Sequence, residues 1–447
     1  MNKKLSILLV LLAVVMSLSV GALGTQATGD YDWEHVAETP SGARQRNTLA
    51  GVSFSSRNFG HSVGFYRDPN ASGLYRTITT RWDGTSWVRT TSANPNLNAD
   101  NLLYGVVTLS PTDAWAVGKV SNSGGGEAGQ VMIQRYDAAT DTWNNYPVTV
   151  PGASESALIG IAAAASNDIW AVGYYRPTDA TTQQPLRTLT LHWDGIAWSP
   201  PILPSQNVGT DDNKLFGVTS VPGSPYLFWA VGASGAAGAN STLVLKYDAR
   251  MTGPGGPTWT VVPSDNVKSV SNCLRGVTAV DEVSAWTAGY AGSDCFQDSP
   301  ETSPVAPESQ TVILKWDAGF SRWNIVTTPN PDTRENGENK LLSISASAPD
   351  KVWAVGYYGS PADDLGHEAG YKTMVLHRHG DGQIETWIQH CSENPSERFW
   401  DRLVGVDAID SEDAWAVGWY YPKEDHPYLK PTLALRYSQP DCHATEP

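Results

Sequence analysis

The chain has 447 residues, 18 of which are Trp, and it carries 46 acidic side chains against 30 basic ones. The net charge of −16 disfavours binding to nucleic acid and to anionic membrane surfaces. An apolar content of 40% with many large aromatic side chains excludes a disordered chain, and 41 Gly and 29 Pro exclude a coiled coil or helical bundle.

The first segment in chain order has the features of a secretory signal peptide. Two lysines, an apolar stretch from Leu5 to Val20 and a run of small residues follow the initial Met. We expect cleavage after Gly24 or Ala27, so that residues 1–27 form the signal and the mature protein is secreted or held at the cell surface. An N-terminal helix retained as an anchor is the alternative. No later stretch is apolar enough to span a membrane.

From residue 47 onward the chain consists of seven copies of one unit, which is typical of a repeat architecture. The most visible segment reads Trp-Ala-Val-Gly, with variants in the first and fifth copies. These segments begin at His61, Trp115, Trp170, Trp229, Trp286, Trp353 and Trp415. A polar residue opens each unit shortly before this segment. These residues are Asn47, Asn101, Ser156, Asn213, Asn272, Asn339 and Asp401.

Each unit predicts four short strands. Alternating apolar residues lead to an aromatic residue, as in Thr188–Trp193, which is the period of a half-buried strand. Pairs such as Asp83-Gly84 and Asp194-Gly195 predict a tight hairpin, after which a second Trp begins the last strand. Four antiparallel strands cannot bury both faces alone, whereas sheets stacked around an axis bury every face.

The two ends of the repeat region favour a closed ring over a linear solenoid. The last copy stops after its third strand at Tyr437, and residues 33–40 resemble the missing fourth strand. We therefore predict an all-β fold over residues 28–447: a single seven-bladed β-propeller with four antiparallel strands per blade, its last blade completed by the N-terminal strand. The blades are expected to start near residues 47, 101, 156, 213, 272, 339 and 401. All Trp residues except Trp400 and Trp419 then belong to the packing between blades.

The hairpin at Asp194–Trp198 resembles the Asp-box hairpin of sialidase-like propellers. The segments Asp113–Gly118 and Leu191–Gly195 are similar to secreted bacterial propellers related to photosystem II stability/assembly factors. This resemblance implies the fold and says little about function. The chain departs from the box, because His192 stands where the family has Ser or Thr and Arg378 replaces an aromatic residue in the sixth copy.

The sequence favours binding over catalysis. A sialidase-like site needs three Arg for the substrate carboxylate, a Tyr activated by a Glu, and an acid/base Asp. The Arg residues are scattered without the family's frame, and the family's Arg-Ile-Pro signature is absent. We expect a monomeric, non-catalytic module that binds an extracellular protein or a glycan. A glycan-active enzyme, hydrolase or lyase, and an extracytoplasmic assembly factor are the alternatives.

The longest loops between second and third strands predict the binding surface, since such loops carry function in repeat folds. They lie at residues 291–310, 359–371 and 420–430, in three neighbouring units. The candidate binding residues are Trp400, Trp419, Tyr420, Tyr421, His426, Tyr428, Asp363, Asp364 and His367. We expect the aromatic ones to be exposed. Loop variation without function is the alternative.

No cofactor is expected, with calcium as the exception to test. The runs Asp211-Asp212-Asn213 and Asp363-Asp364 supply oxygen ligands on loops, and a solvated acidic loop is the alternative. The polar residues that open the units are expected near the axis, where they either line a channel mouth or cap their own turns.

Four Cys allow two disulfides in an exported chain. Cys273 and Cys295 are the preferred pair, since both fall on the same face of one unit. Cys391 and Cys442 form a weaker pair, because they bond only if the C-terminal tail wraps around the last unit.

Overall fold

A computed structural model describes residues 33–36, 46–121, 129–179, 184–199, 206–251, 257–267, 270–296, 308–361, 370–379, 386–396, 400–421 and 431–437. Every described residue lies in one compact unit, Tyr31–Pro447. In these ranges the fold is all-β, with 27 strands. None of the described residues forms a helix long and apolar enough to cross a membrane.

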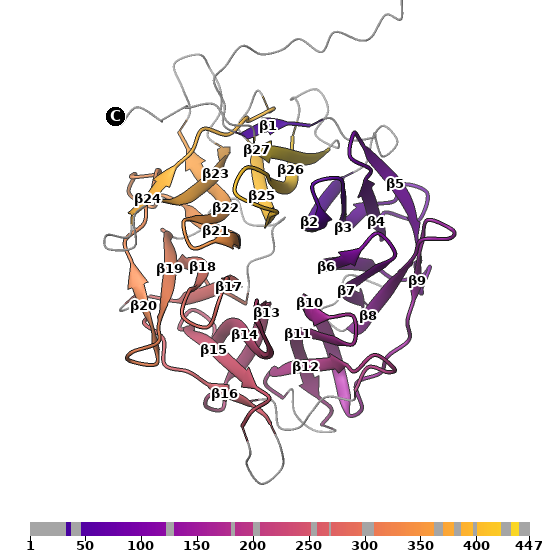
Figure 1. Cartoon of the computed structure of the whole chain (residues 1–447), viewed down its shortest axis with the longest axis horizontal. Coiled ribbons are helices and arrows are strands. Elements are labelled where there is room, and N and C mark those ends of the chain that lie inside the picture. The colour runs from indigo at the N-terminus through magenta and orange to yellow at the C-terminus, as the bar shows by residue number, and fades with distance from the viewer. Residues whose placement is uncertain are drawn as a thin grey trace, which may run out of the picture. The chain divides into compact units, whose positions relative to one another are not determined.

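The strands form six sheets in which strands that follow one another in sequence pair antiparallel (Figure 1). The eight-stranded sheet comprises β2 (Asn47–Ser56), β3 (Phe59–Arg67), β4 (Tyr75–Trp82), β5 (Trp87–Ser92), β9 (Thr142–Asn145), β8 (Gly129–Asp137), β7 (Asp113–Ser121) and β6 (Asn101–Ser110), in that order. It consists of two meanders, β2–β5 and β6–β9. They are joined by a short parallel pairing of β5 with β9 at Thr91 and Ser92.

Four further sheets are single meanders. They comprise β10 (Ala153–Ala165), β11 (Asp168–Pro177) and β12 (Arg187–Trp193); β13 (Asp212–Val221), β14 (Ser224–Gly235), β15 (Ser241–Asp248) and β16 (Trp259–Val261); β17 (Asn272–Ala279), β18 (Ala285–Ala291), β19 (Gln310–Asp317) and β20 (Arg322–Val326); and β21 (Asn339–Ala348), β22 (Lys351–Ser360), β23 (Gly370–His379) and β24 (Thr386–Gln389).

The last sheet joins the two ends of the repeat region. It comprises β25 (Asp401–Ala408), β26 (Ala414–Tyr420), β27 (Thr432–Tyr437) and the N-terminal strand β1 (Trp33–His35). β1 runs antiparallel to β27, with Trp33 opposite Tyr437. The N-terminal segment therefore supplies the fourth strand that the last repeat lacks.

The first strand of each meander lies innermost, which gives a propeller-like arrangement (Figure 1). The strands β2, β6, β10, β13, β17, β21 and β25 contact one another in this order, and β25 contacts β2. Each of them has a β-bulge against its partner strand, which re-aims one side chain. The bulged residues are Ala50, Tyr104, Ile159, Phe216, Arg275, Leu342 and Val404.

Glycine after the bulge lets neighbouring inner strands approach. A Cβ on Gly51 would lie 2.8 Å from the carbonyl oxygen of Tyr104, and a Cβ on Gly405 would lie 3.3 Å from that of Ala50. The sixth copy has Ser343 at this position, and its hydroxyl accepts the backbone N–H of Val406 at 3.2 Å. The same repeat position thus joins neighbouring sheets through close packing in most copies and a hydrogen bond in one.

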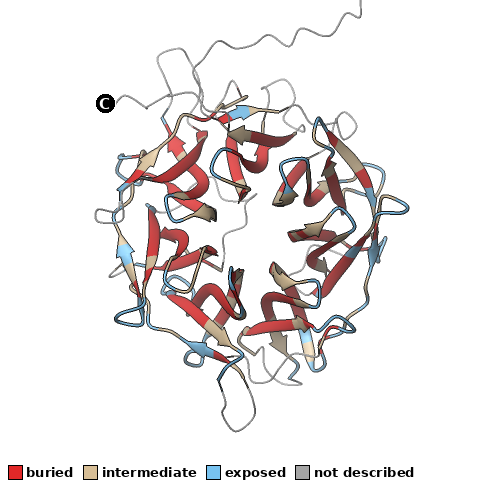
Figure 2. Ribbon diagram, viewed as in Figure 1, coloured by how far each residue is buried: buried red, intermediate tan, exposed pale blue. Residues whose placement is uncertain are grey.

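The Trp residues of the repeat pack between sheets, as the sequence predicts. The ring of Trp115 lies 4.8 Å from that of Trp193 and 5.6 Å from that of Trp198, both in the next sheet. Trp415 of the last sheet contacts Trp82 of the first at 4.7 Å. Figure 2 shows the result, with buried residues concentrated within the sheets and exposed residues mainly at the outer turns.

Candidate functional site

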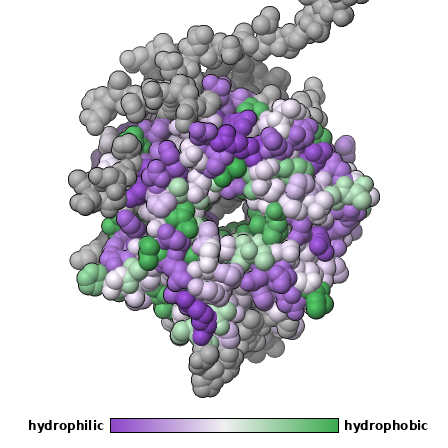
Figure 3. All heavy atoms as spheres, in the orientation of Figure 1, coloured by the Kyte–Doolittle hydropathy of each residue, from purple (hydrophilic) through white to green (hydrophobic). Residues whose placement is uncertain are grey.

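The inner strands enclose a central cavity of about 580 Å³. Figure 3 shows its opening in the middle of the molecule. The seven bulged residues line it, so six apolar or aromatic side chains and one cation, Arg275, face the cavity at this level. The bulge is therefore the local feature that delivers side chains to the cavity wall.

Three cations line the cavity: Lys214 on β13, Arg275 on β17 and Arg402 on β25. Lys214 and Arg402 occupy the same repeat position, one residue after the polar residue that opens the unit. All three lie near the beginning of an inner strand, and we call this set the cationic rim. Lys340 occupies the equivalent position on β21, but it is buried and lies 3.1 Å from a carboxylate oxygen of Glu338.

Each rim cation lies against aromatic rings. The Lys214 ammonium is 4.6 Å from the ring centre of Tyr174 and 5.2 Å from that of Phe296. The Arg275 guanidinium is 4.4 Å from the ring centre of Phe216 and donates to the Tyr290 hydroxyl at 2.8 Å. Cation–π contacts hold these long side chains in defined positions at the wall.

Arg402 lies between the two sheets that meet there. Its guanidinium is 4.1 Å from the ring centre of Tyr357, 4.2 Å from that of Tyr371 and 5.3 Å from that of Trp419. Burial raises the pKa of Tyr371 to about 12, and the neighbouring Glu338 carboxylate contributes to this rise. The Tyr371 phenol is therefore neutral at physiological pH.

Two more of the predicted aromatic residues lie against the rings that contact Arg402. The Trp400 ring lies 5.2 Å from Tyr371, and the Tyr421 ring lies 5.4 Å from Trp419 and 6.4 Å from Trp400. The backbone N–H of Tyr421 donates to the Trp400 carbonyl at 3.2 Å. We call the side chains around Arg402 the aromatic cluster: Tyr357, Tyr371, Trp400, Trp419 and Tyr421.

Exposure differs from the expectation for Trp419. Its side chain is only 2% exposed, because it packs beneath Arg402 and beside Tyr421, so the prediction of an exposed ring is wrong there. Trp400 and Tyr421 are half-buried. Tyr420 is also half-buried and lies near His35 of β1, with ring centres 6.0 Å apart. The other predicted binding residues, His426, Tyr428, Asp363, Asp364 and His367, lie outside the described residues.

The carboxyl group of Asp407 also lines the cavity. It accepts the backbone N–H of Phe54 at 2.7 Å and the hydroxyl of Ser345 at 3.3 Å, so it links β25 to the inner strands on both sides. Burial raises its pKa to about 6. These contacts give Asp407 a structural role between three sheets.

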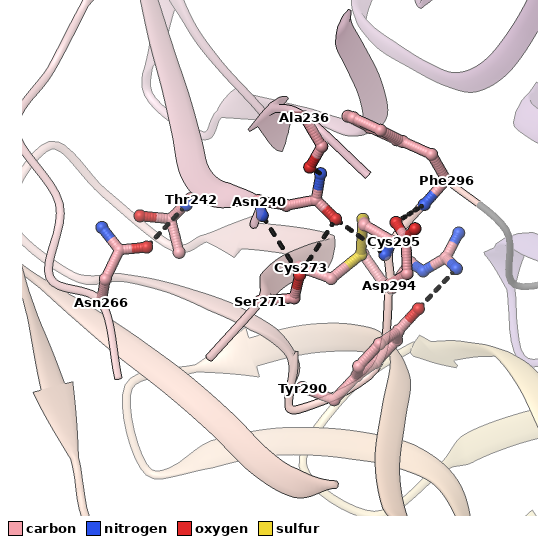
Figure 4. The surroundings of a disulfide bond; sticks show 11 residues. Ala236, Asn240, Thr242, Asn266, Ser271, Cys273, Tyr290, Asp294, Cys295 and Phe296 are labelled. Atoms are coloured by element: carbon pink, nitrogen blue, oxygen red, sulfur yellow. Dashed lines mark hydrogen bonds between the residues drawn. A yellow bond between two sulfur atoms is a disulfide. The ribbon is translucent and has the colours of Figure 1, made fainter. Parts of the chain in front are cut away.

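The Cys273–Cys295 disulfide is confirmed (Figure 4), with a Cα–Cα distance of 5.4 Å. It fixes the segment after β18, in which Phe296 follows directly and contacts Lys214. Asn240 of the preceding sheet accepts the Cys295 N–H at 3.0 Å. The disulfide thereby holds this segment against β17, and the hydrogen bond to Asn240 connects it to the neighbouring sheet. The pairing of Cys391 with Cys442 stays a prediction, since residue 442 lies outside the described residues.

Four of the seven polar residues that open the units, all of them Asn, cap their own turns, whereas Ser156 accepts the Val131 N–H of the preceding sheet at 3.2 Å. Asn213 is typical: its side-chain oxygen accepts the Val208 N–H at 2.9 Å, and its amide donates to the carbonyls of Val208 and Asp211. Equivalent bonds occur at Asn101, Asn272 and Asn339. These side chains are fully buried behind the cavity wall.

Asp401 occupies this position in the last unit. It accepts the Ser396 N–H at 3.2 Å and lies 2.6 Å from the Ser396 hydroxyl. A carboxylate cannot donate as the Asn amides do. Burial raises the Asp401 pKa to about 7.

The calcium hypothesis stays a prediction. Asp212 uses a carboxylate oxygen to accept the Leu186 N–H at 2.7 Å, and the Asp211 carbonyl accepts from Asn213. In the described part of the chain, no group of three or more His, Cys, Asp or Glu side chains is arranged to hold a metal ion.

The sequence did not lead us to predict the cationic rim. The Arg residues, Arg275 and Arg402 among them, have no common frame in the sequence, and Lys214 was not a candidate. The signal lay in the repeat itself. Aligning the units on their opening residue places Lys214, Lys340 and Arg402 where other copies have residues such as Leu102 and Ala157. The bulge that turns Arg275 toward the cavity leaves no comparable mark in the sequence.

No family model and no curated protein matches this chain. Three of the solved structures that are similar to this chain are the following. A protein of unknown function from Dyadobacter fermentans is 10% identical, with 91% of this chain and 100% of that chain covered and a TM-score of 0.45. The PQQ-bound aldose sugar dehydrogenase from Streptomyces coelicolor is 18% identical, with coverages of 78% and 96% and a TM-score of 0.37. A putative 6-phosphogluconolactonase from Bacteroides uniformis is 10% identical, with coverages of 87% and 95% and a TM-score of 0.38. These likenesses establish neither a shared family nor a shared activity.

Proposed function

We propose that the chain is an exported seven-bladed β-propeller that binds a glycan and acts without catalysis. The blade count is supported by the cyclic contacts of the inner strands and by the division of the eight-stranded sheet into two meanders. The β1–β27 pairing supports closure of the ring by the N-terminal strand. The disulfide is compatible with an oxidising, extracytoplasmic location.

The observation that carries the binding function is the aromatic cluster around Arg402. It joins half-buried rings, Trp400 and Tyr421, to a cation that lines the central cavity. Aromatic faces pack against the C–H face of a sugar ring, and a guanidinium donates to its oxygen atoms. A small number of placed polar groups in an aromatic wall is typical of a ligand site.

An array of defined neutral and acidic glycans tests this proposal with the protein lacking residues 1–27. We expect binding that falls at least tenfold in Trp400→Ala, because this variant removes a ring of the cluster. The matched control is Phe320→Ala, which removes an 80% exposed ring from the turn between β19 and β20, far along the chain from the cluster.

Two outcomes would contradict the proposal. Absence of binding to every glycan would remove the binding function in favour of a protein partner or an assembly role. Shortened or unsaturated products after incubation with a bound glycan would instead identify a glycan-active enzyme. Melting temperatures of both variants show whether a loss of binding reflects unfolding.

A further inference from the structure

The cationic rim is positively charged, whereas the protein as a whole is acidic. The chain has 46 acidic and 30 basic side chains, yet Lys214, Arg275 and Arg402 line one cavity. Asp407 is the carboxyl among the described lining residues, and it lies further along β25 than Arg402. Among the described residues that line the cavity, cations therefore outnumber carboxyl groups, and an excess of positive charge attracts anions.

The three cations come from three different sheets around the opening. Lys214 belongs to β13, Arg275 to the neighbouring β17, and Arg402 to β25. A ligand that carries more than one acidic group can therefore pair with more than one of them. Guanidinium groups suit carboxylates because their planar donors pair with both oxygens.

Aromatic rings alternate with these cations along the wall. Phe216, Tyr174 and Phe296 lie beside Lys214 and Arg275, and Tyr357 and Trp419 lie beside Arg402. Such a wall offers apolar contact between the sites for acidic groups. A sugar acid supplies both parts, since its ring or chain has C–H faces and its carboxylates lie at the periphery.

We propose that Lys214, Arg275 and Arg402 bind the carboxylates of an acidic saccharide at the opening of the central cavity. This inference rests on the proposed glycan-binding function and specifies its ligand class. Two sources share the chemistry: a small sugar diacid and a uronate-containing oligosaccharide. The cavity of about 580 Å³ falls within the range of volumes that hold small ligands.

The disulfide acts as a positioning element for this site. Cys295 precedes Phe296, whose ring lies against Lys214, and the Cys295 N–H is bonded to Asn240 of the neighbouring sheet (Figure 4). Removing the Cys273–Cys295 bond loosens the wall beside Lys214. Affinity for the acidic saccharide should therefore fall more than affinity for a neutral sugar.

Calorimetric titration of the oxidised protein tests the proposal with trigalacturonate, galactarate, neutral galactotriose and tetraglutamate. We expect binding of one or both sugar acids, weakening with added salt as exposed charge interactions do. Lys214→Gln and Arg275→Gln should each weaken that binding at least tenfold. The control Arg135→Gln removes a 49% exposed cation from β8, outside the cavity lining, and should leave affinity unchanged.

The four ligands separate the outcomes. Binding of galactarate alone identifies a small diacid as the ligand, and binding of trigalacturonate alone identifies a uronate glycan. Equal affinity for galactotriose, preferential binding of tetraglutamate, or binding to neither sugar acid overturns the inference. If neutral glycans still bind on the array in that case, the proposed function stands and the ligand class is wrong. If no glycan binds on the array either, both the proposed glycan-binding function and the acidic-saccharide inference are wrong. Because Arg402 is buried, its test variant is Arg402→Lys, which keeps the positive charge at that position and removes only the planar guanidinium group.

Discussion

Single residues that depart from the repeat pattern differ in their contacts and ionisation from their counterparts in the other units. His61 takes the place of the repeat Trp and packs 4.5 Å from Tyr136 and 5.0 Å from Trp143, with its Nδ1 3.1 Å from the Thr108 hydroxyl. Burial lowers its pKa to about 3, to which the charge of Arg81 adds. His61 is therefore neutral in the folded protein, and it opposes folding in acid.

Asp401 also departs from the repeat pattern, and its ionisation predicts a pH-dependent change in stability. Its folded pKa of about 7 lies above the ordinary value of 3.8, so the folded state favours the protonated carboxyl. Stability from this group is present below pH 3.8 and is lost as the pH rises toward 7. Asp401→Asn supplies a permanent amide donor, as in the other units. We expect its stability relative to the parent protein to increase by about 2 kcal/mol between pH 5 and pH 8.

Urea denaturation at both pH values measures this difference. Because Asp407 and His61 titrate alike in both proteins, their effects cancel in the comparison. Asp350→Asn, at an exposed turn, is the matched control for replacing a carboxyl group by an amide. A constant offset for Asp401→Asn would contradict the pKa assignment.

At the scale of elements, the glycine of the Trp-Ala-Val-Gly segment lets the first two strands of a meander lie close together. A Cβ on Gly173 would lie 2.0 Å from the carbonyl oxygen of Ala157 on β10. Backbone atoms cannot yield as a side chain can. We expect Gly173→Ala to cost about 3 kcal/mol of unfolding free energy, measured by urea denaturation.

Gly319→Ala is the control for this substitution. Gly319 lies in the exposed turn before β20, and its nearest neighbour to an added Cβ is a side-chain oxygen of Asp317 at 3.3 Å. Its stability should change by less than about 0.5 kcal/mol. Similar costs for both variants would mean that the strand pair adapts to the added methyl group.

At the scale of the whole described unit, the three-residue strand β1 connects two sheets. Trp33 of β1 is fully buried, with its ring 5.1 Å from Trp353 and 5.8 Å from Tyr437. Its N–H donates to the Cys391 carbonyl, so β1 also touches the preceding sheet. β1 thus joins the N-terminal segment to the last two sheets.

Trp33→Ala should therefore destabilise the protein by about 4 kcal/mol, the usual range for a buried Trp. Hydrogen exchange should accelerate first in β27 and β26, which lie beside the lost strand, and later in β13 across the unit. Glu34→Ala, an exposed change in the same strand, is the control. An unchanged melting temperature for Trp33→Ala would mean that β1 contributes little to closure.

Local patterns allowed much of this fold to be predicted, because strands and packing positions repeat along the chain. The Trp positions, the caps at residues such as Asn213 and the Cys273–Cys295 bond all follow from such patterns. The site was only partly predictable. Trp400 and Tyr421 were candidates. Trp419 is buried because it pairs with Arg402 across the β25–β26 hairpin, while Tyr357 and Tyr371 of the preceding sheet lie against Arg402.

By itself, the sequence determined the all-β repeat, the strand order within each unit and the pairing of its two ends, since these depend on periodicity and turn chemistry. The tertiary structure alone decided which side chains face the central cavity. Lys214, Arg275 and Arg402 line the same cavity because close glycine contacts place inner strands from separate repeats around one axis, and a bulge turns Arg275 toward it. No local sequence pattern encodes their shared place on the cavity wall, because the three residues belong to different sheets.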